Sequence, residues 1–140
     1  MLRWLWILSM LTSCATVRTT GVFVEPRAPK ALHLLASDAA YQLGRIYPAA
    51  HTQISFAHET ADDFGDPLVT ALRSLGFAVA APTSRGSQLV IAYVVDDVGP
   101  LYRVVLRIVT KHRRISLARV YTHEGASLHG AGTWTQQVLP

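Results

Sequence analysis

Three long β-rich runs, joined by very short connections, constrain the fold of this chain more than any other feature. The runs are QLVIAYVVDDV, LYRVVLRIVT and RISLARVYTHEG, with the short segments DDVGP and KHRR at their junctions. In the second run, apolar residues at positions 102, 104, 106 and 108 alternate with positions that include Arg103 and Arg107. Antiparallel strands can follow one another through tight turns, whereas parallel strands need a long crossover. The pattern therefore predicts antiparallel neighbours, and in the second run one apolar face.

The segment before these runs contains two amphipathic helical patterns. In ALHLLASDAAYQLGRIYP, apolar residues recur at three- and four-residue spacing, and Pro48 ends the helix. In DDFGDPLVTALRSLGF, Asp66 is the expected N-cap, Pro67 the first helical residue and Gly76 the stop. Between the helices, TQISFAH alternates in the manner of a strand. Two further short strands are expected at FAVAA and GTWTQQV.

Together these segments predict a single α+β domain over residues 31–137, with two helices packed on one face of a mainly antiparallel sheet of about four to five strands. Hydrophobic residues make up 50% of the chain and charged residues only 16%, which excludes disorder throughout. The chain is long enough to bury a core without covalent cross-links, and its single cysteine cannot form an internal disulfide.

The N-terminus has the pattern of a bacterial lipoprotein signal. Arg3 precedes an apolar run of about ten residues, which is well short of the ~20 residues that a membrane-spanning helix needs. LTSC follows, and it resembles the lipobox, in which an aliphatic residue and two small residues precede the cysteine that carries the lipid. The resemblance implies a signal peptide over residues 1–13 and lipid attachment at Cys14. Ala15, in place of aspartate, favours the outer membrane.

Cys14 has two other interpretations besides lipid attachment. An ordinary signal peptide with an incidental cysteine would leave a free N-terminus after cleavage. A catalytic cysteine would need a positioned base and a depressed pKa, and no such base is recognisable near this apolar segment. We therefore expect Cys14 to anchor the chain through a lipid, whose acyl chains contribute about 0.8 kcal/mol per buried CH₂.

Residues 14–30 are expected to form a lipidated N-terminus and a tether to the domain. The segment ATVRTTGVFVEPRAPK is rich in threonine, glycine and proline, and Pro26 and Pro29 argue against regular structure. Within it, GVFVE is an extended apolar patch that could pair with the sheet edge of a partner, although such a segment is more often a linker.

The chain is basic, with a formal charge of +4 and a pI near 9.6, but most basic residues are scattered singly. The exception is KHRR, which brings Lys111, Arg113 and Arg114 together between two of the β-rich runs. One interpretation is the solvated tip of a hairpin, and another is a contact patch for phosphate or lipid headgroups. No DNA- or RNA-binding motif surrounds the segment, so direct contact with DNA is not expected.

The chain lacks the sequence patterns of an enzyme or a metal site. The six histidines show neither helical i, i+4 spacing nor a His-Glu-x-x-His motif. The acidic pairs Asp62–Asp63 and Asp96–Asp97 suit a helix N-terminus and a turn better than acid–base catalysis. RGS and HGAG are short glycine turns rather than phosphate-binding loops. We therefore expect no catalytic residue, no cofactor and no metal.

The order of these segments resembles the TrbH family, small lipoproteins encoded among the mating-pair-formation genes of conjugative elements. GDPLVTALRSLGF and SLARVY…GTWT weigh most in the resemblance, which extends from about Ala31 to Gln137. It implies a structural or accessory subunit of a type IV secretion apparatus, held at the outer membrane with its domain facing the periplasm. Other channel subunits would be its partners, and Cys14 is the one functional residue that maps onto this sequence.

Two alternatives to a channel subunit stay open. A periplasmic regulatory lipoprotein that binds and activates a cell-wall enzyme also combines a tether with a small α+β domain. Its tether, however, must be long enough to reach the peptidoglycan. A binding module for a small ligand would need a concave apolar pocket, which a sequence does not display.

Overall fold

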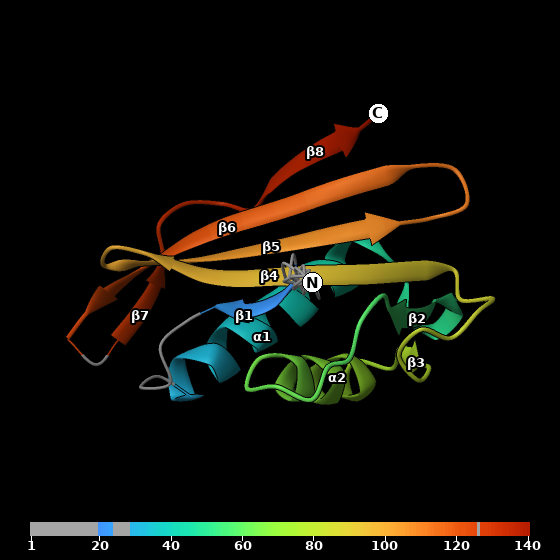
Figure 1. Ribbon diagram of the computed structural model, residues 1–140, viewed down its shortest axis with the longest axis horizontal. Coiled ribbons are helices and arrows are strands. Elements are labelled where there is room, and N and C mark those ends of the chain that lie inside the picture. Colours follow the sequence, from blue (N-terminus) through green and yellow to red (C-terminus); the bar gives the residue numbers. More distant parts are fainter. Residues whose placement is uncertain (1–19, 24–28, 126) are drawn as a thin grey trace, which may run out of the picture.

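The computed structural model of the 140-residue chain describes residues 20–23, 29–125 and 127–140. Both helices lie on one side of a curled sheet (Figure 1). In chain order the elements are β1 (Gly21–Phe23), α1 (Pro29–Ile46), the short 3₁₀ helix η1 (Ala49–His51), β2 (Gln53–Phe56), α2 (Gly65–Ser74), β3 (Ala78–Val79), β4 (Leu89–Val98), β5 (Leu101–Val109), β6 (Arg114–Glu124), β7 (Ser127–Gly130) and β8 (Thr135–Leu139).

The antiparallel neighbours expected from the three β-rich runs are confirmed. β4 pairs with β5, and β5 pairs with β6, both in antiparallel register. In β5, Val104, Leu106 and Ile108 are fully buried, whereas Arg103 and Arg107 are exposed on the opposite face. Because successive side chains of a strand point to opposite faces, this alternation places one face of β5 in the core.

The expected fold class is wrong in the number and the direction of its strands. The sheet has eight strands rather than four to five, and it is mixed rather than mainly antiparallel. β2 pairs in parallel with both β3 and β4, and β1 also pairs in parallel with β4. The reason is that α2 carries the chain back toward the starting end of β2, so that β3 runs in the same direction as β2.

The long strand β6 accounts for two of the additional pairings. β8 pairs with its first half, with Arg114 opposite Leu139, and β7 pairs with its second half, with Glu124 opposite Ser127. The short strand expected at GTWTQQV is therefore confirmed as β8, whereas β7 was not predicted. β7 forms because the chain turns back at Gly125, which has φ +64°, a conformation that favours glycine.

β1 lies within the segment that was predicted to be a tether. Its three residues pair with Val94 to Asp96 of β4, beyond the part of β4 that pairs with β2. Between these two parallel neighbours, the backbone N–H of Tyr93 donates to His58 Nε2 at 3.3 Å. The imidazole therefore accepts a hydrogen bond from a backbone donor of β4 that lies between the stretches paired with β1 and β2. The predicted boundaries of the signal peptide, the tether and the domain stay predictions.

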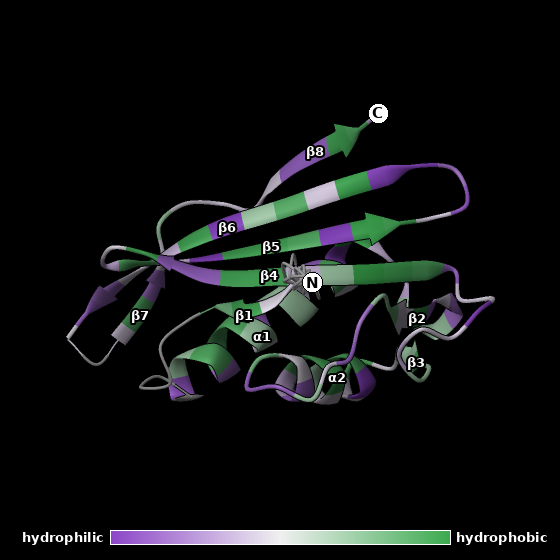
Figure 2. Ribbon diagram, viewed as in Figure 1, coloured by the Kyte–Doolittle hydropathy of each residue, from purple (hydrophilic) through white to green (hydrophobic). Residues whose placement is uncertain are grey.

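The core lies between the sheet and the two helices. The apolar stripe predicted for α1 is buried at Leu32, Leu35 and Leu43, and α2 contributes Leu68 and Leu72. β4 and β5 are hydrophobic along most of their length, β6 alternates between hydrophobic and hydrophilic residues, and the turn between β5 and β6 is hydrophilic (Figure 2). Among the described residues, no helix combines the length and the apolar composition that crossing a bilayer requires.

The start of α2 differs from the prediction. Phe64, rather than Asp66, is the N-cap residue, and Asp66 lies in the first turn. The Oδ1 atom of Asp62 accepts the backbone N–H groups of Phe64 at 3.0 Å and Gly65 at 2.6 Å, which satisfies donors that a helix start leaves open. Only glycine fits at position 65, because an added Cβ would lie 2.3 Å from the Tyr93 hydroxyl and from a backbone carbonyl oxygen.

The predicted end of α2 is confirmed. The helix ends at Ser74, and Gly76 has φ +92°. The backbone N–H groups of Gly76 and Phe77 donate to the carbonyl oxygens of Arg73 and Leu72, at 3.0 and 3.1 Å. These two bonds form a Schellman motif, in which glycine adopts the left-handed conformation at low cost.

Candidate functional site

The predicted lipid attachment residue, Cys14, lies outside the described residues. The same is true of the predicted signal peptide over residues 1–13. Lipid attachment therefore stays a prediction from the lipobox pattern.

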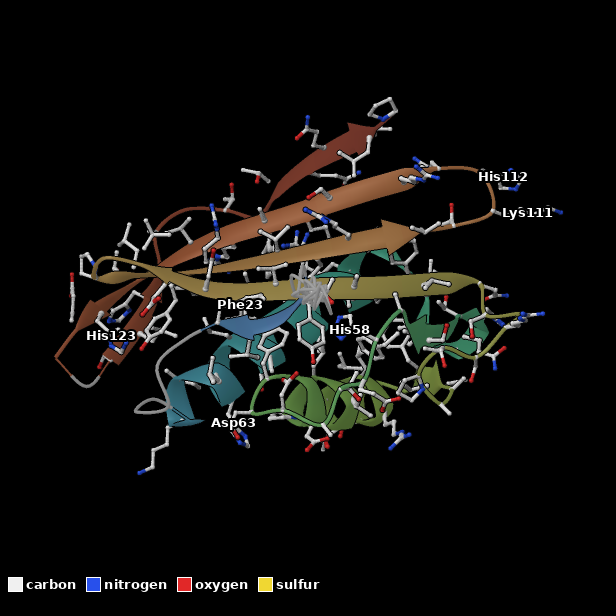
Figure 3. All side chains as sticks on the ribbon, in the orientation of Figure 1. Phe23, His58, Asp63, Lys111, His112 and His123 are labelled. Carbon is white, nitrogen blue, oxygen red and sulfur yellow. The ribbon has the colours of Figure 1, made fainter. Side chains whose placement is uncertain are left out.

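The predicted basic patch lies at the turn between β5 and β6, where Lys111, Arg113 and Arg114 are all exposed. The backbone N–H of Thr110 donates to the carbonyl oxygen of Arg113 at 2.9 Å, and Thr110 Oγ1 accepts the N–H groups of His112 and Arg113. The basic side chains take no part in these hydrogen bonds. Lys111 and His112 extend away from this end of the sheet (Figure 3). The segment is a hairpin turn, and its role as a contact patch stays a prediction.

A cavity of about 600 Å³ lies beside this turn. Its apolar wall comes from Tyr47, Leu89, Val90 and Val109, and the loop before β4 and the β5–β6 turn complete it. The hydroxyl oxygens of Tyr47 and Ser87, which both line the cavity, are buried and have no hydrogen-bond partner among the described residues. Burial raises the pKa of the Tyr47 phenol, although the Arg113 guanidinium acts in the opposite direction. The Tyr47 hydroxyl therefore keeps its proton and can donate it to a hydrogen bond.

The segments around this cavity carry only positive formal charge. Residues 44–53, 80–90 and 107–116 contain no aspartate or glutamate. Within residues 20–23, 29–125 and 127–140, two arginines form ion pairs, Arg103 with Asp96 and Arg119 with Asp38, and neither lies in these segments. The basic residues that do lie in them are Arg45, Arg85, Arg107, Lys111, Arg113 and Arg114.

A second polar cluster connects α1 to the C-terminal part of the sheet through Asp38. Its Oδ2 atom accepts hydrogen bonds from Arg119 Nη1 at 2.8 Å, Tyr121 Oη at 2.5 Å and Trp134 Nε1 at 2.9 Å. Arg119 Nε also donates to the carbonyl oxygen of Gly132 at 2.9 Å, which holds the loop before β8. We refer to Asp38, Arg119, Tyr121 and Trp134 as the Asp38 cluster.

The chemistry of the Asp38 cluster suits a structural tie. Burial raises the pKa of the Tyr121 phenol far above its ordinary value, and the hydrogen bond to Asp38 adds to the effect. The phenol therefore stays protonated and donates to the carboxylate. Since one oxygen of Asp38 already accepts three donors and the charge of Arg119 compensates its own, the cluster is a compensated network rather than a reactive one.

The acidic pairs noted in the sequence have structural partners in the fold. Asp62 caps α2, and its Oδ2 accepts the Tyr93 hydroxyl at 2.5 Å. Asp96 forms a two-point ion pair with Arg103, directly opposite on β5. Asp63 and Asp97, the other members of the pairs, are exposed.

The histidines do not converge on a common site. Two of them contact tyrosine rings. The ring centroid of His58 lies 4.5 Å from that of Tyr93, and the ring centroid of His123 lies 4.8 Å from that of Tyr102. Among the described residues, no three histidine, cysteine, aspartate or glutamate side chains are close enough to hold a metal ion.

Sequence reasoning missed both the Asp38 cluster and the cavity. Arg119 and Trp134 lie 81 and 96 residues from Asp38, so no local pattern connects them. One feature of the sequence does point to the Asp38 cluster. Asp38 lies beside Leu35 and Ala39 on the first predicted helix, and a carboxylate next to such buried residues is costly unless it has a partner. The cavity carries no comparable signal, because three separate segments form it.

Comparison with known proteins adds one match to this geometry. A family model described as "Conjugal transfer protein TrbH" matches residues 17–138, which include nearly all of the described domain. This match confirms the resemblance drawn from the sequence. The family is not a known enzyme family. No curated protein and no solved structure matches the chain.

Proposed function

Because the chain belongs to the TrbH family of conjugal transfer proteins, we propose that it is a structural or accessory subunit of a conjugative type IV secretion apparatus. We propose further that a lipid on Cys14 anchors it at the outer membrane, with the domain facing the periplasm. The family match over residues 17–138 is the observation that carries the proposal.

The open face of the sheet supports a role in assembly. Both described helices lie on the other face (Figure 1), so the side chains between the buried positions of β4 to β6 point away from the core. Val90, Val94, Val105 and Val120 on this face are only half-buried, and Val109 is 42% exposed. Arg107 lies among these valines on the central strand β5, between Ala92 of β4 and Ser116 of β6, and such a surface of apolar residues with an arginine is typical of a protein interaction site.

The position of β1 bears on the alternative of a cell-wall regulator. Seven peptide steps join Cys14 to Gly21, where pairing with β4 begins. Even a fully extended chain of that length spans at most about 25 Å. A lipid on Cys14 would therefore keep the domain close to the membrane, whereas a regulator that reaches the peptidoglycan needs a longer tether. This limit favours a channel subunit.

The proposal is tested by comparing the wild-type chain with Cys14→Ser in a conjugative donor cell. We expect the wild-type protein to gain the mass of a diacylglyceryl and an acyl group and to fractionate with the outer membrane. Cys14→Ser should lose both properties and lower the frequency of transfer. Ser13→Ala is the matched control, because it keeps a small residue before the cysteine and should leave processing unchanged. A soluble, unmodified wild-type protein would refute the anchor, and normal transfer by a deletion strain would refute the role in conjugation.

A further inference from the structure

The cavity beside the β5–β6 turn has the size and composition of a ligand site. Its volume of about 600 Å³ lies within the range of roughly 300–1,000 Å³ that is common for small-molecule pockets. Tyr47, Leu89, Val90 and Val109 give it an apolar wall, and Leu89 belongs to the buried core. A ligand there would lay an apolar body against this wall.

The polar groups of the cavity are suited to a ligand that carries a hydrogen-bond acceptor. Buried hydroxyl groups in proteins nearly always have a partner, and an unpaired one destabilises the fold. The Tyr47 and Ser87 hydroxyls line this cavity, are buried, and have no partner in the described part of the chain. Both oxygens have almost no accessible surface, so a ligand oxygen accepts from them only after nearby side chains shift.

The charges around the cavity call for a negative ligand. Lys111 and His112 line the cavity, and Arg113 is close enough to act on the Tyr47 phenol. The three segments that surround it contain no acidic residue. In the described part of the chain, ion pairs join Arg103 to Asp96 and Arg119 to Asp38, so neither Lys111 nor Arg113 forms one.

From these three features we propose that the cavity binds an anionic amphiphile, a molecule with a phosphate or carboxylate head and an apolar chain. The head lies toward Lys111 and accepts hydrogen bonds from the Tyr47 and Ser87 hydroxyls, and the chain lies along Val90 and Val109, which are directly opposite each other on β4 and β5. This site is independent of the proposed role in conjugation, since it rests on the cavity alone.

The test is a titration of the full chain, held in phosphatidylcholine nanodiscs, with hexyl phosphate, which combines the two required parts. Inorganic phosphate and hexanol are the controls for the head and for the chain. We expect hexyl phosphate to bind at least tenfold more tightly than either control. The backbone amide NMR signals of Ser87 and Lys111 should shift on binding.

Two pairs of matched variants locate the site. Tyr47→Phe should weaken the binding of hexyl phosphate about fivefold, the equivalent of one hydrogen bond. Tyr41→Phe should not change it, because Tyr41 lines a different cavity. Lys111→Gln should weaken binding about threefold to fivefold. Lys30→Gln should leave it unchanged, because Lys30 lies at the opposite end of α1 from Tyr47.

Adding phosphatidylglycerol to the nanodisc identifies the source of the ligand. Competition with hexyl phosphate points to a membrane lipid, and absence of competition points to a soluble amphiphile; either result supports the site. Binding of hexyl phosphate no tighter than that of inorganic phosphate would overturn the proposal, since the cavity would then hold an anion only. Unchanged affinity in both Tyr47→Phe and Lys111→Gln would overturn it as well.

Discussion

Replacing Asp38 with alanine removes the carboxylate that joins α1 to β6 and to the loop before β8. Three donors lose their acceptor at once: Arg119 Nη1, Tyr121 Oη and Trp134 Nε1, which lie 2.5 to 2.9 Å from the same oxygen. The substitution leaves the apolar core intact, because neighbouring Leu35 and Ala39 are unchanged. Its effect therefore measures the polar network alone.

The magnitude follows from the burial of each donor. The Tyr121 side chain is almost fully buried, with 4% exposure, and an unpaired buried hydroxyl costs about 1.5 kcal/mol. The partly buried Trp134 N–H adds about 0.5–1 kcal/mol. The side chains of Asp38 and Arg119 are 31% and 23% exposed, so their ion pair contributes only about 0.5 kcal/mol. Alanine favours the helix by about 0.5 kcal/mol over aspartate, which leaves a net loss of about 2–2.5 kcal/mol.

Urea unfolding of the full chain in neutral detergent, followed by far-UV circular dichroism, measures this loss. Asp97→Ala is the matched control, because Asp97 is exposed and its side chain forms no ion pair among the described residues; its effect should stay below about 0.5 kcal/mol. The double variant Asp38→Ala/Tyr121→Phe should show a coupling of about 1 kcal/mol. A loss below about 1 kcal/mol for Asp38→Ala, or an equal loss in the control, would refute the structural role of the cluster.

Two further sets of measurements follow from the fold. Gly65→Ala should destabilise the protein by about 2–3 kcal/mol, because its Cβ would lie 2.3 Å from the Tyr93 hydroxyl. Gly44→Ala in α1 should instead stabilise it by about 0.5–1 kcal/mol, since the nearest atom to the added Cβ lies at 3.7 Å. Changes of melting temperature in the same direction for both variants would contradict this reasoning. Because the pKa of Tyr121 in the folded state is raised above its ordinary value of 10.0, the stability it contributes is present below pH 10 and is lost as pH rises above it. Tyr121→Phe should therefore reduce the loss of stability above pH 10 by up to about 1.4 kcal/mol per pH unit, and identical pH profiles would show that the phenol titrates normally.

The elements that the sequence predicted well are those whose pattern is local. The alternation in β5 and the stripe in α1 repeat over many residues, so the burial of Leu106 and Leu35 could be predicted without knowing their neighbours. Gly76 likewise acts within its own turn. Asp66 was given the wrong role because Asp62, only four residues earlier, is equally suited to cap a helix, and the packing of Gly65 against Tyr93 selects Asp62.

The strand pairings were harder to predict because they depend on partners far along the chain. A strand is expected at FAVAA, where β3 lies, but the two residues of β3 and the three of β1 are too few to show which strands they pair with, and backbone hydrogen bonds to β2 and β4 decide this. The same limit explains why a segment predicted as a tether contains a strand. A parallel neighbour such as β2 cannot be told from an antiparallel one by its own side chains.

By itself, then, the sequence determined the family of this protein, the central antiparallel strands and the two helices, since each rests on local patterns of residues, and it predicts the anchor at Cys14. Only the tertiary structure decided the mixed eight-stranded sheet, the Asp38 cluster and the basic cavity beside Tyr47. Each of these joins side chains or backbone groups from distant segments, which only folding brings within bonding distance. Burial then raises the free-energy cost of a polar group that lacks a partner.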